Sequence, residues 1–165
     1  MTKIVVFGNS GAGKSTFAKN LVKTKLLAHF DLDTIAWLPG IPPIRRPVEQ
    51  SNNAINEFIT NNTSWVIEGC YCDLIELVLP KASEIIFLNL SVDDCIQNAR
   101  RRPWEPHKYK TKQQQDANLD MLIEWISQYE NRTDNLSKHA HQRLYDNFEG
   151  KKTIYTSNIE WLQTK

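Results

Sequence analysis

Short apolar runs rich in β-branched residues alternate along the chain with longer amphipathic stretches. The apolar runs have the length and composition of strands that are buried on both faces. They cover residues 4–7, 26–32, 65–67, 85–90 and 152–156. The amphipathic stretches carry apolar residues at helical spacing. They cover residues 15–25, 47–61, 91–102, 113–129, 137–148 and 159–162.

This order of elements predicts the fold class. Strands that alternate with helices are typical of βαβ units, in which helices cover both faces of a parallel sheet. We therefore expect a three-layer α/β domain with a five-stranded parallel sheet. With 165 residues, the chain is long enough to bury one core of its own. Residues 1–165 are thus expected to form a single domain.

The helix at residues 47–61 illustrates how buried positions are assigned. Pro47 suits the first turn of a helix, where its missing N–H group is not needed. An apolar stripe follows and is expected to face the core. It consists of Val48, Ile55, Phe58 and Ile59.

The strongest local motif lies between the first strand and the first helix. Residues 8–15 read Gly-Asn-Ser-Gly-Ala-Gly-Lys-Ser and match the phosphate-loop (P-loop) pattern without a gap. Glycines let the backbone turn sharply and direct its N–H groups at one point, and the helix N-terminus favours an anion there. The residues expected to bind a nucleotide here are Gly8, Asn9, Ser10, Gly11, Ala12, Gly13, Lys14, Ser15 and Thr16.

Two side chains of this loop have separate expected roles. Lys14 brings a positive charge to the terminal phosphates and is a candidate catalytic residue, and the Ser15 hydroxyl is placed to hold Mg²⁺. The alternative is a glycine-rich turn that binds nothing. Such turns rarely carry Lys-Ser at this position between a strand and a helix, so the motif favours a nucleoside triphosphate, with ATP and Mg²⁺ as the expected cofactors.

Acidic residues stand where predicted strands end. Asp31 and Asp33 are two residues apart, so in an extended segment both side chains would point to the same face. Glu68 closes the strand at residues 65–67 and is expected beside the phosphate loop. One carboxylate near Mg²⁺ can orient its ligands, and another can accept the proton of an attacking hydroxyl. Each acid taken alone is more often a solvated turn residue, but their joint placement favours a functional role for Asp31 or Asp33.

Composition excludes several classes of partner and points to a compartment. The net charge is +1, which favours neither nucleic acid nor an acidic membrane as the main partner. Three cysteines are an odd number and do not make a disulfide framework. The apolar run at residues 4–7 is too short for a signal peptide or a membrane span. We expect a cytoplasmic protein with no membrane partner.

The rest of the chain narrows the class of P-loop protein. The base-reading Asn-Lys-x-Asp segment of GTPases is missing, and so is the apolar strand ending in Asp-Glu that AAA and transporter ATPases carry. The ordered motifs instead resemble those of the small P-loop kinases, which include shikimate, gluconate and nucleoside monophosphate kinases. Residues 31–33, Asp-Leu-Asp, look like the Asp-x-Asp of shikimate-kinase-like enzymes. Residues 31–40 and 67–71 together are most similar to an adenylate-kinase-related branch whose members are often labelled "topology modulation" proteins.

The resemblance implies roles for particular residues. Asp31 would help to hold Mg²⁺, and Asp33 would contact the acceptor hydroxyl and act in catalysis. Residues 37–61 would form an acceptor segment, and residues 100–115 a helical lid segment. The residues implied are Arg101 for catalysis, Arg100 and Asn158 for the nucleotide, and Arg45, Arg46 and Glu68 for the acceptor.

The departures from known members concern the acceptor. The triple-glycine segment and the Gly-Glu-x-x-Phe-Arg segment of shikimate kinases are missing, and so is the lid pattern of adenylate kinases. The leading hypothesis is an ATP-dependent kinase for a small-molecule hydroxyl or phosphate acceptor. A nucleic-acid-end kinase or nucleic-acid-binding ATPase is the second hypothesis, because residues 100–112 are basic and aromatic. A nucleotide-binding regulatory protein with little catalysis is the third.

Overall fold

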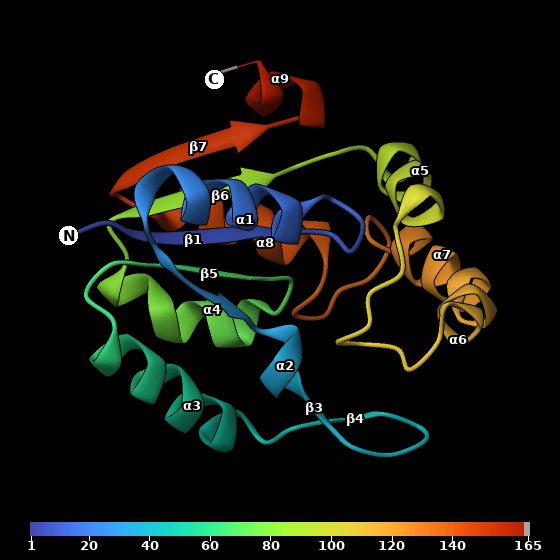
Figure 1. Ribbon diagram of the computed structural model, residues 1–165. Helices are drawn as coiled ribbons and strands as arrows, with labels where there is room; N and C mark the ends of the chain where they lie inside the picture. Colours follow the sequence, from blue (N-terminus) through green and yellow to red (C-terminus); the bar gives the residue numbers. More distant parts are fainter. Residues whose placement is uncertain (164–165) are drawn as a thin grey trace.

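Within residues 1–163, which the computed structural model describes, five strands form one parallel sheet. Their spatial order is β2-β5-β1-β6-β7, and all neighbours pair in parallel (Figure 1). The strands are β1 (Lys3–Gly8), β2 (Ala28–Asp31), β5 (Trp65–Gly69), β6 (Glu84–Leu88) and β7 (Lys151–Tyr155). The five-stranded parallel sheet predicted from the sequence is confirmed.

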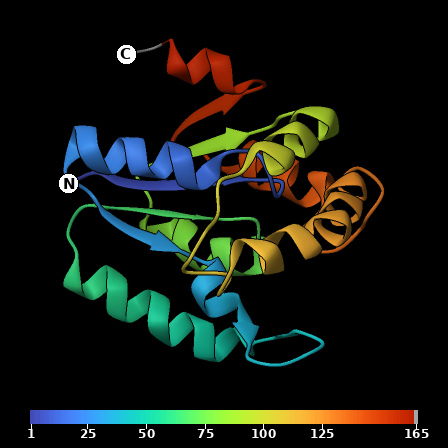
Figure 2. The same cartoon turned by 45° about the vertical axis from the view of Figure 1, so that its right-hand side comes forward.

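Helices cover the sheet on both faces, as Figures 1 and 2 show. One face packs against α3 (Val48–Asn61), α4 (Cys72–Val78) and α8 (Lys138–Asn147). The other packs against α1 (Lys14–Lys25), α5 (Val92–Arg101) and α9 (Asn158–Leu162). The three-layer α/β architecture is therefore confirmed as well.

Strand β1 shows why two cores form. Successive side chains of a strand point to opposite faces, so Val5 and Phe7 pack on the α8 side and Ile4 and Val6 pack on the α1 side. All four side chains are fully buried. This explains why the sequence shows a continuous apolar run here instead of an alternating one.

The remaining elements gather at the carboxyl ends of the strands. They are α2 (Asp33–Ala36), the antiparallel pair β3 (Trp37–Leu38) and β4 (Ile44–Arg45), α6 (Lys112–Ala117) and α7 (Leu119–Ser127). The short 3₁₀ helix η1 (Leu79–Lys81) is an exception, because it lies just before β6. Helix α7 packs beside α5, and the chain between α5 and α6 runs down toward α2 in both views (Figures 1 and 2).

The structure corrects the sequence prediction in several places. Val48 is 40% exposed and not buried, because it is the first residue of α3 and lies at the open end of that helix. The helix predicted at 113–129 is two helices, which are separated by Asn118. Helix α4 was not expected, because it has only 7 residues and its apolar residues lie on more than one side, so no helical period stands out. No helix within residues 1–163 has the length and apolar character needed to cross a membrane.

Candidate active site

The phosphate loop turns directly from β1 into α1. The Ala12 N–H donates to the Asn9 carbonyl at 3.2 Å and closes the turn. Gly11 and Gly13 have φ values of 78° and 87°, which side chains rarely allow. A Cβ atom on Gly11 would also collide with the backbone carbonyl of Cys95. The loop therefore needs Gly11 in order to pack against α5, and Gly13 for the backbone conformation that opens α1.

Residues of the loop divide into those that face the cleft and those that support it. Ser10, Gly11, Gly13, Lys14, Ser15 and Thr16 line the cleft. Gly8, Asn9 and Ala12 are buried behind them. The Asn9 side chain donates to the Ile126 carbonyl of α7, and the Asn9 carbonyl accepts from Lys14 Nζ at 2.8 Å. Lys14 thus lies across the loop, with its ammonium at the place expected for phosphate binding.

Two asparagines brace the loop from the far side. Asn158 Nδ2 donates to the Ala12 carbonyl at 3.0 Å, and Asn98 Nδ2 donates to the Gly11 carbonyl at 2.9 Å. Asn98 Nδ2 also donates to Asn158 Oδ1 at 2.7 Å. Asn158 lines the cleft, and its amide holds the loop. Asn98 belongs to no motif and was not predicted from the sequence.

Asp31 and Asp33 meet at the end of β2, but not in the way the sequence predicted. The strand stops at Asp31, and Asp33 begins α2 after a turn in which its N–H donates to Asp31 Oδ1 at 2.9 Å. A turn is favoured here because an Asp side chain readily bonds the backbone two residues ahead. The extended segment was thus wrong, although the structure does bring both carboxylates together.

Lys108 of the lid segment connects that segment to this acidic pair. Its Nζ lies 3.0 Å from Asp33 Oδ2, 4.0 Å from Asp31 Oδ2 and 3.9 Å from Glu105 Oε1. In the sequence, Lys108 was only one of several cations in a basic stretch. The contact joins residues that are 75 positions apart, and no spacing rule links them.

Tyr71 contacts the same carboxylate from the side of β5. Its hydroxyl donates to Asp33 Oδ1 at 2.6 Å and accepts from the Trp37 indole N–H at 2.8 Å. Burial alone would raise the pKa of Asp33, but the nearby Lys108 ammonium, the Tyr71 hydroxyl and Lys14 outweigh it and lower that pKa. Asp33 is therefore held ionised.

Asp31 experiences the opposite balance. Burial, followed by the negative charges of Glu68 and Asp33, raises the pKa of Asp31 to about 6, and Lys108 offsets only part of this. Glu68 is buried between the strands beside Asp31, and its Oε1 lies 3.3 Å from His29 Nε2. The excess of negative charge at this point suits a cation.

The donor set fits Mg²⁺ at a nucleotide better than a metal centre made of protein alone. Within residues 1–163, no three or more His, Cys, Asp or Glu side chains form a group that could hold a metal ion. Mg²⁺ typically takes one or two protein ligands and completes its shell with phosphate oxygens and water. Ser15 lines the cleft, and Asp31 lies just behind the lining residue Asp33, 4.0 Å from Lys108 Nζ, so these two oxygens are the candidate ligands for such an ion.

The predicted arginines separate into two groups. Arg101 lines the cleft, whereas Arg100 is exposed outside the cleft lining. Arg45 pairs with Asp73 through Nη2, and Arg46 donates to backbone carbonyls of residues 35 and 37. The structure therefore does not bring Arg45 or Arg46 to the lining of the cleft.

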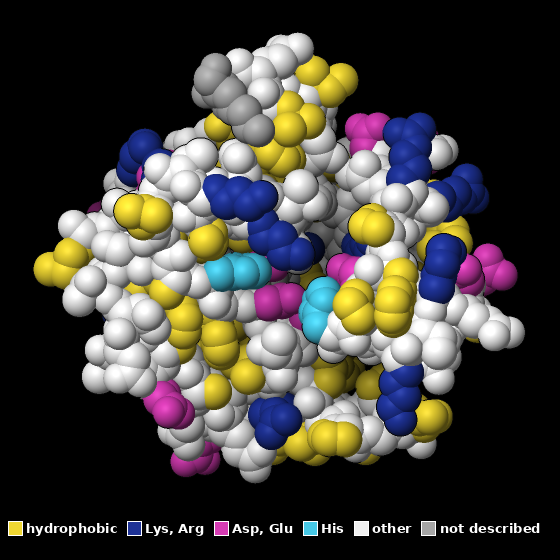
Figure 3. Space-filling view, viewed as in Figure 1, with side chains coloured by type: hydrophobic (Ala, Val, Ile, Leu, Met, Phe, Trp, Pro, Cys, Tyr) yellow, Lys and Arg dark blue, Asp and Glu magenta, His cyan; other side chains and the backbone are white. Residues whose placement is uncertain are grey.

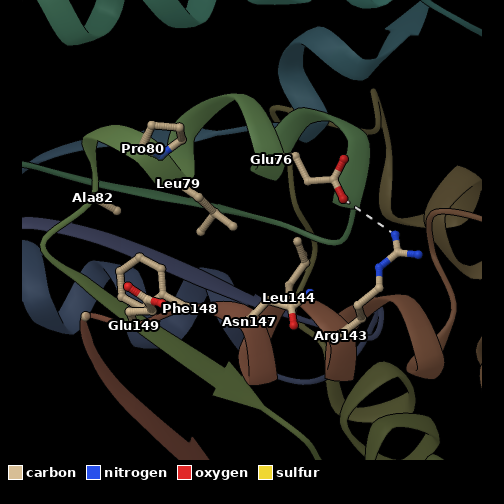
Figure 4. A pocket seen from close by; sticks show the side chains of 10 residues that line it. Glu76, Leu79, Pro80, Ala82, Arg143, Leu144, Asn147, Phe148 and Glu149 are labelled. Carbon is tan, nitrogen blue, oxygen red and sulfur yellow. Dashed lines mark ion pairs between the residues drawn. The ribbon is translucent and has the colours of Figure 1, made fainter.

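The phosphate loop, Asp33, Glu68, Tyr71, Arg101 and Lys108 line one cavity of about 1200 Å³. Figure 3 shows acidic, basic and histidine side chains gathered near the middle of this face. A second cavity of about 570 Å³ lies at the opposite end of the sheet, where Glu76 and Arg143 pair at 3.5 Å (Figure 4). Ligands of open parallel sheets bind at the carboxyl ends of the strands, so the first cavity is the candidate active site.

Comparison with solved structures identifies the fold. A deoxyadenosine kinase from M. mycoides with bound dATP matches with a TM-score of 0.50 and 11% identity, covering 98% of this chain and 97% of that one. This chain has the small P-loop kinase fold. A shikimate kinase from Bacteroides thetaiotaomicron has a TM-score of 0.47 and 19% identity, covering 88% and 97% of the two chains. An uncharacterized protein from Eubacterium ventriosum has a TM-score of 0.49 and 14% identity over the full length of both chains.

Sequence comparison adds no family to this result. No protein-family model matches the chain, and no curated protein matches it. Within the P-loop kinase fold, the cleft is lined by the phosphate loop and by Asp33 together with Lys108 and Tyr71. The last two were not identified as site residues from the sequence.

Proposed function

We propose that the chain is an Mg²⁺- and ATP-dependent phosphotransferase that acts on a small-molecule hydroxyl or phosphate acceptor. The observation that carries the proposal is the convergence on one cavity of the phosphate loop, an ionised carboxylate and a lid cation. Phosphoryl transfer needs little covalent help from a protein, and depends on positioning and on charge stabilisation. These are the functions that such a set of residues can supply.

The loop residues act on the donor. Backbone N–H groups of the loop and the Lys14 ammonium hold the β- and γ-phosphates, while Ser15 and Asp31 hold Mg²⁺. Bound Mg²⁺ neutralises charge on the phosphates. Arg101, at the end of α5 and on the cleft, is the cation placed to stabilise charge on the transferring group.

Asp33 acts on the acceptor. Its ionised carboxylate accepts a hydrogen bond from the acceptor hydroxyl and so aims the oxygen lone pair at the γ-phosphorus. As the new O–P bond forms, the bond from the γ-phosphorus to the bridging oxygen breaks, ADP leaves, and the hydroxyl proton passes to Asp33. Tyr71 and Lys108 keep this carboxylate in place.

A coupled assay for acceptor-dependent ADP release tests the proposal. Metabolites with hydroxyl groups, nucleosides and nucleoside monophosphates form the panel, with Mg²⁺ and ATP present. We expect release with at least one acceptor, and a fall of about 10³-fold or more in kcat for Lys14→Ala, because the main cation on the phosphates is lost.

The control is the fold of the variant. Lys14→Ala should keep the circular dichroism spectrum and Tm of the wild-type protein, because the Lys14 side chain contributes no core packing. Full turnover in a folded Lys14→Ala protein would contradict the mechanism. Tight ATP binding without transfer to any acceptor would favour the regulatory alternative, and transfer to oligonucleotide ends would favour the nucleic-acid alternative.

A further inference from the structure

The cleft has two halves that meet at Lys14. On the donor half, α1 and α5 flank the phosphate loop, and Asn98 of α5 bonds the Gly11 carbonyl. Lys19 and Arg101 line this half from the same two helices. On the other half lie α2, β3 and the turn after β5, opposite the lid segment. An acceptor that meets Asp33 must enter this second half.

Three cations around the acceptor half are already engaged. Arg45 Nη2 contacts both oxygens of Asp73, at 3.0 and 3.2 Å, and its guanidinium stacks 4.8 Å from the centre of the Tyr71 ring. Arg46 donates to the backbone carbonyls of Ile35 and Trp37, at 3.0 and 3.4 Å. Lys108 pairs with Asp33. None of these three cations is offered to a phosphate or carboxylate of the acceptor.

Three acids lie close together beside the acceptor half. Asp31, Asp33 and Glu68 lie on adjacent segments, and Lys108 is the cation that reaches two of them. An anionic group brought in here would meet negative charge in a partly desolvated site, where repulsion is strong. The electrostatics of this half therefore favour an acceptor without negative charge.

Aromatic side chains supply the other feature of the acceptor half. Trp37 and Tyr71 meet edge to face, with ring centres 6.3 Å apart, and the indole N–H bonds the Tyr71 hydroxyl. Trp104, 44% exposed, and Tyr109 line the same cavity from the lid segment. These four aromatic side chains thus line one cavity, and the Arg45 guanidinium lies over Trp37, 5.6 Å from its ring centre. Such surfaces suit a planar ring, because a flat ring can stack on them.

We infer that the acceptor is an uncharged compound with a planar ring and a free hydroxyl, of the nucleoside class, and not a phosphate- or carboxylate-bearing one. The inference rests on the proposed function and adds the substrate class. The ring lies against Trp37, and the hydroxyl reaches Asp33 beside the γ-phosphate. Trp37 is then a specificity-determining residue.

Nucleosides and their 5′-monophosphates are the matched probes, because they differ only in the charged group. Binding is measured by calorimetry with Mg²⁺ and a saturating non-hydrolysable ATP analogue. The analogue occupies the phosphate loop, so the nucleoside cannot bind there. Transfer from ATP is measured separately with the same compounds. We expect at least one nucleoside to bind and accept phosphate, with kcat/KM about tenfold or more above that of its monophosphate.

Substitution of Trp37 tests whether its ring provides the affinity for the nucleoside. Trp37→Leu removes the flat surface and should raise the KM for the nucleoside about tenfold, while the KM for ATP changes less than about twofold. Trp37→Phe keeps a ring and should restore most of the affinity. An equal loss in both variants would contradict stacking and would assign the effect to the indole N–H.

Failure of this inference and failure of the proposed function give different results. Transfer to monophosphates or hydroxy acids, with no nucleoside bound, overturns the acceptor class and leaves the kinase in place. A nucleoside that binds and is weakened by Trp37→Leu, without any transfer, supports the acceptor class and contradicts the kinase. Absence of nucleoside binding to the folded wild-type protein overturns the inference.

Discussion

At the scale of single residues, Lys108 and Tyr71 decide how Asp33 behaves. Both stabilise the ionised carboxylate and thereby lower its pKa against the effect of burial. The sequence pointed to Asp33 because an acid at a strand end is a recognisable signal. It did not point to Lys108, since a lysine in a basic segment gives no sign of which acid it meets.

Replacement of Lys108 should move the pH dependence of turnover. In Lys108→Met the carboxylate loses its nearest cation, so the pKa of Asp33 rises and Asp33 becomes protonated at a higher pH. The acid limb of the kcat/KM profile should therefore shift to higher pH, with turnover near neutral pH less affected. The profile is measured with the best acceptor of the panel.

Lys110→Met is the matched control, because Lys110 is an exposed cation of the same lid segment. Its acid limb should stay with that of the wild-type protein. An unmoved limb in Lys108→Met would show that Lys108 does not set the charge of Asp33. Equal shifts in both variants would assign the effect to overall charge.

At the scale of elements, buried contacts hold the turn after β5 in place behind the site. His141 of α8 is fully buried, with Nδ1 2.7 Å from the Tyr129 hydroxyl and Nε2 2.8 Å from the Cys70 carbonyl. A carbonyl can only accept, so Nε2 carries the proton and Nδ1 accepts from Tyr129. This joins α8 and the end of α7 to the residue before Tyr71. In the sequence, His141 was merely a histidine of a polar helix.

His141 should make the folding stability depend on pH. Burial lowers its pKa from 6.5 to about 3. The unfolded chain therefore binds a proton below pH 6.5 that the folded chain does not, so stability falls as pH drops from 6.5 toward 3. The free energy of unfolding should lose about 1.4 kcal/mol per pH unit in this window. Urea denaturation across the window measures it.

Two variants separate the contribution of His141 to the pH dependence of the free energy of unfolding from the contributions of the carboxylates. His141→Gln should lose stability at neutral pH and show a shallower slope below pH 6.5. His139→Gln, at an exposed position of the same helix, should keep the slope of the wild-type protein. Equal slopes in all three proteins would contradict a neutral, buried His141.

Local signals predicted most elements and part of the site. The phosphate loop and the strands are encoded over a few residues. Helix α4 was missed because it is buried on several sides. The turn that places Asp33 was missed because it depends on a hydrogen bond from the Asp33 N–H to the Asp31 side chain. The contacts of Lys108 and Asn98 join segments that lie far apart in the sequence, so no short sequence pattern predicts them.

At the scale of the whole molecule, the topology makes one cleft out of distant segments. After β5 the chain crosses β1 to build the other side of the sheet, so the loop after β1 lies at the centre of the carboxyl edge. The lid segment then returns across this edge from α5 toward α2 (Figure 2). The order of elements predicted the sheet, whereas the acceptor half follows from how the lid segment folds back.

The central claim is that this cleft moves the γ-phosphoryl group of ATP onto an acceptor hydroxyl. The most direct measurement incubates the protein with Mg²⁺, isotopically labelled γ-phosphate ATP and the acceptor panel, and locates the label by mass spectrometry. We expect label on an uncharged hydroxyl compound, and none with Lys14→Ala. Label found only in inorganic phosphate or retained in ATP, with a folded protein that binds ATP, would contradict it.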